Sequence, residues 1–224
     1  MTERELRNDY VRALEGYLGA REGDERHREL IDWYNRLPVL PRGYKMTVND
    51  DWCVAAAVAV AVKLGLTEVI FPECSCTRAI ALYRQEGRFV RDRSYIPQVG
   101  DFVVYDWQGN ADPDHWGTVA AVEGDKLTVI EGNMTDRVDR RSVTIGDKRI
   151  YGYCLPDYGK LAEGDGFADV PQDAWYAEAV ALCASLGLMV GREDGTFDPA
   201  APVTRAELAA VTMRLHKLLT DTNS

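Results

Sequence analysis

The sequence predicts an α+β domain followed by a small α-helical module. Three observations support this: apolar residues recur at helical spacing as far as residue 86, they alternate with period two between residues 101 and 155, and a glycine-rich stretch then precedes a second helical segment. Because the helices come before the strands instead of alternating with them, we expect helices packed on an antiparallel sheet. A chain of 224 residues has room for one medium and one small domain.

Four helices are predicted in the first half of the chain. They span residues 3–18, 24–36, 52–64 and 76–86. Asn49, Asp50 and Asp51 offer side chains that could cap the third helix. That helix is rich in alanine and apolar almost all round, so we expect it to be buried.

The second half of the first domain reads as a meander of short strands. The predicted strands span residues 101–106, 116–122, 126–131, 141–145 and 149–155. Turns containing Gly124-Asp125 and Gly146-Asp147 separate the later strands. An antiparallel sheet is the expected product.

A linker and a helical module complete the chain. Residues 159–166 hold three glycines among charged residues, which is typical of a linker. Helices are predicted over 176–186 and 205–218, around a turn-rich segment. We therefore expect a first domain over 1–158 and a second over 167–219.

Composition excludes several classes of protein. With 26 Lys and Arg against 36 Asp and Glu, the net charge of −10 argues against nucleic acid or an anionic membrane as the partner. The longest apolar run, Val54–Val62, is too short to cross a bilayer. The first seven residues are charged and lack an apolar stretch, so we expect synthesis in the cytoplasm without a signal peptide.

The five cysteines predict neither a disulfide framework nor a metal site. Their number is odd, and the chain is long enough to fold without cross-links. Cys74 and Cys76 are too close in sequence for a zinc motif, and we interpret them as free thiols. The carboxylates Asp106, Asp112 and Asp114 do not have EF-hand spacing and are interpreted as turn residues. We expect no metal and no cofactor.

Cys53 is the candidate nucleophile. It lies in the first turn of the predicted buried helix, where free backbone amides and the helix dipole would favour a thiolate. The alternative is a small buried residue beside Ala55–Ala57. Of the histidines, His27 and His216 are expected to be solvated, whereas His115 begins a strand after a polar loop and is placed to act as a base.

Glu131 and Asn133 end the following strand, and either could orient His115. Side chains on paired antiparallel strands share a face only if the paired residue numbers have an even sum. A two-residue turn at Gly124-Asp125 would put Glu131 on the wrong face of the sheet. We therefore predict a three-residue turn or a β-bulge, which would complete a Cys, His and acid or amide arrangement suited to acyl transfer.

Four motifs in this order resemble the CHAP domains, the cysteine, histidine-dependent amidohydrolases/peptidases of the NlpC/P60 superfamily. The motifs are Asn49-Asp-Asp-Trp-Cys53, Val99-Gly-Asp-Phe-Val-Val-Tyr105, Asp114-His-Trp-Gly-Thr-Val119 and Val129-Ile-Glu-Gly-Asn133. The likeness covers roughly residues 10–158, and residues 17–35 also resemble phage endolysins.

The resemblance implies a papain-like fold and a role for each residue of the site. Cys53 would attack an amide carbonyl, His115 would transfer the proton, Glu131 would orient His115, and Asn133 would assist. The backbone amide of Cys53 would meet the oxyanion, and Asp51 would line the cleft. Some CHAP domains bind calcium before the nucleophile, but residues 44–49 lack that pattern.

The second module resembles an S-layer homology domain over about 50 residues. The matching segments are Phe167-Ala-Asp-Val-Pro171, Ala174-Trp-Tyr176, Gly187-Leu-Met-Val-Gly191, Asp194-Gly-Thr-Phe-Asp-Pro199 and Val203-Thr-Arg-Ala-Glu207. The resemblance implies binding to secondary cell-wall polysaccharide, with Arg205 on an acidic group such as a pyruvyl ketal and Trp175 against a sugar. Alternatively, Arg205 caps Glu207 or the linker and Trp175 belongs to the core. A single copy suggests trimerisation, weak binding or a structural role.

These resemblances predict an enzyme that cleaves an amide of bacterial peptidoglycan and is held at the wall by its second module. A phage or prophage endolysin, acting as an N-acetylmuramoyl-L-alanine amidase or an endopeptidase, fits this description. One alternative is a catalytically inactive wall-binding or adhesive protein. Another is a cytosolic cysteine peptidase without a wall partner.

Overall fold

The computed structural model describes residues 1–162, 167–171, 173–192 and 194–221. The chain divides into two compact units, one formed by Glu5–Leu161 and the other by Ala162–Ser224 together with Met1–Arg4. Part of the predicted linker, residues 163–166, lies outside the described residues.

Four α-helices occupy the first half of the larger unit, close to the predicted ranges. They are α1 (Glu3–Glu15), α2 (Glu25–Tyr34), α3 (Cys53–Leu64) and α4 (Cys76–Gln85). The predicted burial of the third helix is confirmed, because every residue from Cys53 to Ala61 is buried. Gly65 ends α3 in the left-handed conformation, with φ of 72°, that glycine adopts without steric cost.

The predicted cap of α3 is wrong. Its N-cap residue is Trp52, which makes no side-chain capping hydrogen bond. Asp50 instead accepts hydrogen bonds from the Thr47 backbone N–H at 2.7 Å and the Tyr44 hydroxyl at 2.6 Å. None of the three predicted capping residues is therefore the N-cap of α3, the helix that Cys53 begins.

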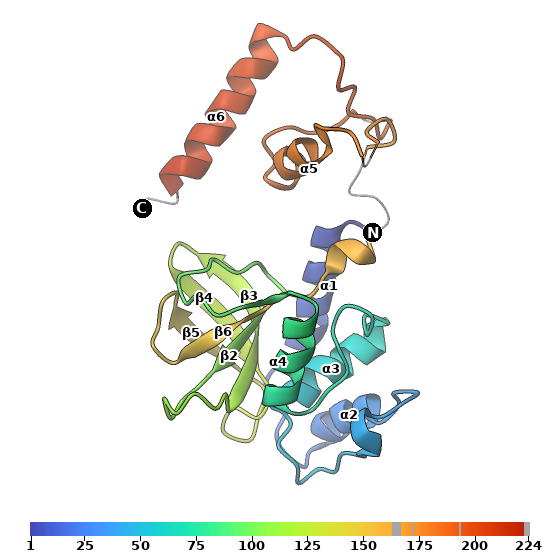
Figure 1. The fold of residues 1–224 in the computed structure, drawn as a ribbon, viewed down its shortest axis with the longest axis vertical. Helices are drawn as coiled ribbons and strands as arrows, with labels where there is room; N and C mark the ends of the chain where they lie inside the picture. The colour runs from blue at the N-terminus through green and yellow to red at the C-terminus, as the bar shows by residue number, and fades with distance from the viewer. Residues whose placement is uncertain (163–166, 172, 193, 222–224) are drawn as a thin grey trace. The chain divides into compact units, whose positions relative to one another are not determined.

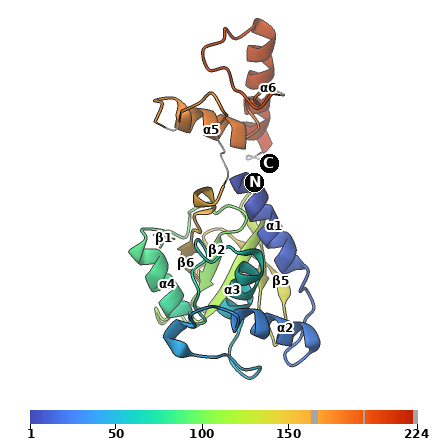
Figure 2. The same cartoon turned by 90° about the vertical axis from the view of Figure 1, so that its right-hand side faces the viewer.

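Six strands form one antiparallel sheet in the order β1-β6-β2-β3-β4-β5. Their bounds are β1 (Phe89–Val90), β2 (Phe102–Tyr105), β3 (His115–Glu123), β4 (Lys126–Glu131), β5 (Asp139–Thr144) and β6 (Ile150–Cys154). The sequence did not predict β1, a two-residue strand on the edge beside β6. The α+β class is confirmed, with α1 to α4 of the larger unit gathered on one side of the sheet (Figure 1 and Figure 2).

Both faces of the sheet are covered by apolar side chains. Towards the helices, the Phe102 ring lies 6.1 Å from that of Tyr10 on α1 and 6.1 Å from that of Tyr83 on α4. The opposite face has its own buried cluster, made of Val103, Tyr105, Val119, Leu127, Val129, Val143, Ile150 and Tyr153. A strand with both faces buried explains why all four residues of β2 are inaccessible to solvent.

The hairpin of β3 and β4 contains the predicted bulge. Glu123 pairs with Lys126, so the turn has two residues, but the register shifts between Val119 and Ala121. Ala120 is the extra residue, and beyond it Gly117 pairs with Glu131. The bulge, the second of the two alternatives, restores the parity that places Glu131 on the face of His115.

His27 corrects one expectation. We expected it to be solvated, but it is fully buried on α2 and its ring lies 4.5 Å from that of Trp52. Its Nδ1 accepts a hydrogen bond of 2.9 Å from the Gly23 backbone N–H. Burial lowers the pKa of His27, which keeps the ring neutral.

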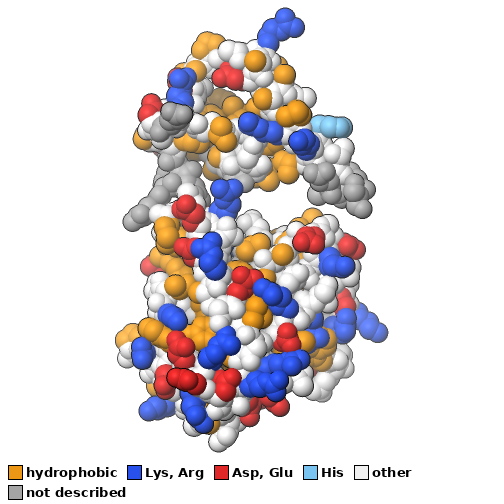
Figure 3. Space-filling view, turned by 180° about the vertical axis from the view of Figure 1, so that it is seen from behind, with side chains coloured by type: hydrophobic (Ala, Val, Ile, Leu, Met, Phe, Trp, Pro, Cys, Tyr) orange, Lys and Arg blue, Asp and Glu red, His pale blue; other side chains and the backbone are white. Residues whose placement is uncertain are grey.

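The C-terminal unit contains α5 (Ala177–Ser185) and α6 (Arg205–Asp221). Asp169 organises the segment between them by accepting backbone hydrogen bonds from Phe197 and Asp198. Thr204 and Glu207 form a reciprocal capping box at the start of α6. Figure 3 shows apolar side chains on the surface of this unit. Over the described residues, no helix has both the length and the hydropathy needed to cross a membrane.

Candidate active site

Cys53 is the first residue of α3, and its side chain is only 8% exposed. At this position the thiol lies next to backbone amides that have no partner within the helix, and the Val54 amide lowers the pKa of Cys53. Gly132, just after β4, allows the helix to approach the sheet here. A methyl group on Gly132 would lie 2.6 Å from the Cβ of Ala56.

His115 and Glu131 are in direct contact. The Nε2 of His115 lies 3.0 Å from the Oε2 of Glu131, whose side chain is fully buried. His115 begins β3 and pairs with Tyr105, while Glu131 ends β4. Gly117 leaves space for this contact, because a methyl group there would lie 2.8 Å from the Cγ of Glu131.

Arg141 on β5 is a further partner of Glu131 that the sequence analysis missed. Its Nε donates a hydrogen bond of 2.7 Å to the Oε1 of Glu131, so His115 and Arg141 bind one carboxylate oxygen each. The guanidinium lies 4.6 Å from the centre of the Trp107 ring, which stacks on Tyr105. Hydrogen bonds to two cationic partners thus hold Glu131 in place, and the stacked rings of Trp107 and Tyr105 lie beside the Arg141 guanidinium.

Cys76 is a second neighbour that the sequence analysis did not find. It begins α4, and its Sγ lies 3.8 Å from the Sγ of Cys53. The sequence predicts free thiols at Cys74 and Cys76, and both are unbridged in the structure. Only Cys76 touches Cys53, whereas Cys74 accepts a hydrogen bond of 3.5 Å from Arg42.

Asn133 does not join this cluster through His115. It lies beyond the end of β4 with a φ of 55°, a left-handed conformation that asparagine tolerates better than most residues. Its Nδ2 donates a hydrogen bond of 3.3 Å to Asp51, in the loop before α3. Asn133 therefore links the end of β4 to the segment that leads into Cys53.

The charges of the site favour a thiolate beside an imidazolium. The hydrogen bond from Cys76 has the largest effect on the pKa of Cys53 and lowers it; burial opposes this, and His115 lowers it further. Burial alone would lower the pKa of His115, but hydrogen bonds with Cys53 and Glu131 outweigh it and raise that pKa to about 9. Burial would raise the pKa of Glu131, but His115 and Arg141 lower it.

Within the described ranges, no group of three or more His, Cys, Asp or Glu side chains is arranged to hold a metal ion. The loop carboxylates instead bond to nearby groups: Asp106 accepts from the backbone of Ala111, and Asp114 accepts from the backbone of Trp107. The chemistry available at this site is that of a thiol, an imidazole and a carboxylate.

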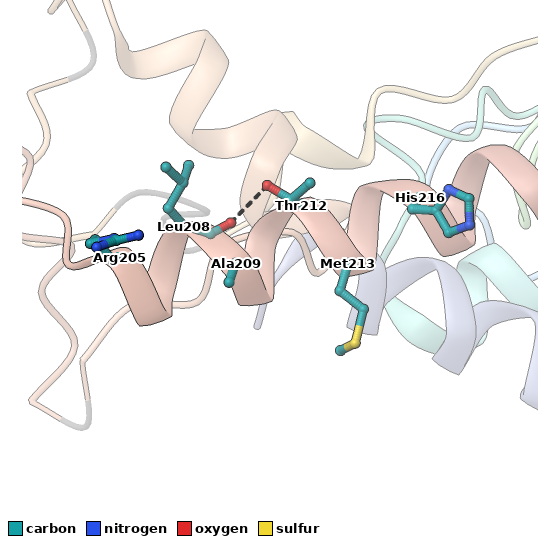
Figure 4. A pocket seen from close by; sticks show the side chains of 6 residues that line it. All are labelled: Arg205, Leu208, Ala209, Thr212, Met213 and His216. Carbon is teal, nitrogen blue, oxygen red and sulfur yellow. Dashed lines mark hydrogen bonds between the residues drawn. The ribbon is translucent and has the colours of Figure 1, made fainter.

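The two residues expected to bind sugar, Trp175 and Arg205, have different neighbours. Trp175 is 93% exposed and packs edge-on against Tyr176, so the alternative that it belongs to the core is wrong. Arg205 begins α6 and lies at the end of an open hollow of about 510 Å³ along that helix (Figure 4). The other lining residues are Leu208, Ala209, Thr212, Met213 and His216. Glu207 accepts hydrogen bonds from the backbone N–H and the hydroxyl of Thr204.

Comparisons with known proteins agree with this division of the chain. The family model of the CHAP domain matches residues 43–133, and that of the S-layer homology domain matches residues 166–209. No curated protein matches the chain. A solved structure described as "The crystal structure of Ly7917 with the hydrolyzing product of MDP" is 19% identical with a TM-score of 0.34, and the match covers 58% of this chain and 62% of that one. The chain is therefore similar to the CHAP domain over residues 43–133 and to the S-layer homology domain over residues 166–209.

Proposed function

We propose that the protein is a cysteine-dependent hydrolase that cleaves an amide bond of bacterial peptidoglycan while its S-layer homology domain holds it at the cell wall. The observation that carries this proposal is the contact of His115 with the buried Glu131, together with the lowered pKa of Cys53 beside that imidazole. The CHAP match supports a hydrolase, and the S-layer homology match supports a location at the wall.

In this mechanism the Cys53 thiolate attacks the carbonyl carbon of the amide. The oxygen gains negative charge in the tetrahedral intermediate, and the free amides at the start of α3 are suited to stabilise it. Collapse of the intermediate breaks the C–N bond and leaves a thioester on Cys53. Asp51, which accepts a hydrogen bond from Asn133, lies two residues before the nucleophile and would line the cleft.

His115 supplies and recovers the proton. An ionised carboxylate only accepts hydrogen bonds, so Nε2 of His115 carries the hydrogen shared with Glu131 and Nδ1 is left to exchange a proton with Cys53 and the leaving amine. After the amine leaves with that proton, neutral His115 accepts one from water, which hydrolyses the thioester. Glu131 holds the ring in this orientation throughout.

The test of catalysis is a cell-wall gel assay with Cys53→Ala. We expect the variant to lose clearing, because it lacks the nucleophile, and to keep the circular dichroism spectrum of the wild type. Cys154→Ala, which removes a buried thiol from β6 outside the site, is the control and should keep clearing. Clearing by Cys53→Ala equal to wild type would exclude Cys53 as the nucleophile, and a wild-type protein that does not clear the gel would favour a wall-binding or adhesive protein instead.

The bond that is cleaved is an amide of the stem peptide, the cross-bridge or the muramoyl-alanine link. Mass spectrometry of fragments released from defined peptidoglycan distinguishes these possibilities. Free lactyl-muramic ends identify an N-acetylmuramoyl-L-alanine amidase, and a new amino-acid amine identifies an endopeptidase. Either activity fits a phage or prophage endolysin.

At the wall, we propose that the second domain, residues 167–219 after a linker at 159–166, binds a secondary cell-wall polysaccharide. Arg205 and Trp175 are suited to this because both are exposed, one offering a guanidinium to an acidic group and the other a ring face to a sugar. Exposed apolar side chains of α6, including Leu208 at 56% and Met213 at 55%, favour association with a second copy. Light scattering of the full chain tests for that oligomer.

A further inference from the structure

We propose that Cys76 is a positioning residue of this site, whose thiol donates a hydrogen bond to the Cys53 sulfur and holds it as the attacking nucleophile. The proposal rests on the function proposed above, because it assigns Cys76 a part in the same reaction. It gives a role to a side chain that the Cys, His and Glu arrangement leaves unexplained.

The geometry brings two helix starts together. Cys53 begins α3 and Cys76 begins α4, and their sulfur atoms are 3.8 Å apart, a distance at which one thiol can donate to the other sulfur. Cys53 is buried and Cys76 is partly buried, so water does not freely replace this contact. A thiol is a weak donor, but a bond to an ionised acceptor is stronger than a bond to a neutral one.

The surrounding charges decide which sulfur keeps its proton. Cys53 faces His115 from β3, backed by Glu131 from β4 and Arg141 from β5. Cys76 faces the Cys53 sulfur and the Asp114 carboxylate from the loop before β3, and both raise its pKa. The imidazolium therefore stabilises a thiolate at Cys53, while Asp114 disfavours one at Cys76, so Cys76 is the donor.

Cys74 provides a matched control two residues earlier in the chain. It is also a partly buried free thiol, but its neighbours are Tyr34, Arg42 and Glu73 and not Cys53. A general effect of removing a thiol from this segment would appear in Cys74→Ala as well as in Cys76→Ala. An effect through the Cys53 sulfur would appear only at position 76.

The experiment measures iodoacetamide alkylation of Cys53 in the full-length protein as a function of pH, followed by mass spectrometry of the Cys53 peptide. In Cys76→Ala we expect the midpoint of alkylation to rise by about one pH unit, so that alkylation below the midpoint slows about tenfold. Cys76→Ser keeps a hydrogen-bond donor, so its midpoint of alkylation should lie close to that of the wild type. Cys74→Ala should leave the midpoint where it is in the wild type.

Two results would overturn the proposal. One is a Cys76→Ala midpoint equal to that of the wild type, and the other is an equal shift in Cys76→Ser and Cys76→Ala, which would indicate packing without hydrogen bonding. Alkylation uses no peptidoglycan, so its outcome is separate from the proposed function. Clearing of cell walls by Cys53→Ala would instead exclude Cys53 as the nucleophile of the proposed reaction, whatever the alkylation curve of the wild type.

Discussion

At the scale of single residues, Glu131 links the groups of the candidate site. It is fully buried, yet it stays ionised because His115 and Arg141 bind its two oxygens at 3.0 Å and 2.7 Å. A buried carboxylate without such partners would take up a proton. Its negative charge in turn helps to keep His115 protonated well above the usual pH range of a histidine.

This arrangement predicts the pH dependence of activity. The reactive pair is a thiolate with an imidazolium, so kcat/KM should rise as Cys53 ionises and fall as His115 loses its proton near pH 9. The pKa of His115 is raised by Cys53 and by Glu131, and Glu131→Gln removes the second of these charges, so the alkaline limb should move to lower pH. We also expect kcat/KM to fall by about 10²-fold or more, because the ring loses its orientation.

The measurement is a pH profile of clearing rate on purified walls. Glu123→Gln is the matched control, because Glu123 lies on the neighbouring strand at the exposed end of the hairpin. It should leave both limbs in place. An unchanged alkaline limb in Glu131→Gln would contradict the role assigned to Glu131.

Sequence reasoning reached His115 and Glu131 but not their other partners, for physical reasons. His115 begins one strand of a hairpin and Glu131 ends the other, so local pairing rules could test whether they meet. Arg141 reaches Glu131 through the pairing of β4 with β5, and Cys76 reaches Cys53 through the packing of two helix starts. No spacing in the sequence encodes the second kind of contact.

At the scale of elements, small features of backbone geometry bring the site together. The bulge at Ala120 turns Glu131 to the face of His115, and Gly132 lets the end of β4 lie against α3. The parity of the strand pairing predicted the bulge, since a two-residue turn alone would place His115 and Glu131 on opposite faces of the sheet. The short strand β1 was not predictable, because two residues carry too little pattern and its pairing with β6 is nonlocal.

A substitution at Gly132 tests the contact between the sheet and α3. A methyl group there would lie 2.6 Å from the Cβ of Ala56 and 3.3 Å from the ring of Trp52, so Gly132→Ala must push the first turns of α3 away. We expect the free energy of unfolding to fall by about 1–3 kcal/mol, and clearing to fall as Cys53 moves from His115. Urea denaturation and the gel assay measure the two effects.

The contact between position 132 and Ala56 can be tested with a second substitution as a control. Ala56→Gly removes the methyl group that position 132 would meet, at a cost of about 1 kcal/mol for glycine inside a helix. If the clash is the cause, the double variant should be less destabilised than the sum of the single changes, and it should regain part of the clearing. Simple additivity would contradict this account of Gly132.

At the scale of the whole molecule, the larger unit contains the candidate active site and the smaller unit has exposed apolar side chains. The larger unit buries many of its aromatic residues on the two faces of its sheet, whereas the smaller unit leaves Trp175, Val190 and Leu219 more than half exposed. A unit with such a surface is suited to hold a ligand or another chain. Attachment through one unit would raise the concentration of the other near its substrate.

This coupling predicts how binding variants behave. Arg205→Ala and Trp175→Ala should each lower the fraction of full-length protein that sediments with purified walls, and each should slow the clearing of walls. Cleavage of soluble peptidoglycan fragments should stay unchanged, because the Cys53 site is untouched. Lys217→Ala, which removes another exposed cation from α6, is the control and should sediment like the wild type. Equal sedimentation of all three variants would mean that other residues bind the wall. Slower cleavage of soluble fragments would mean that the substitutions damage the fold and not attachment alone.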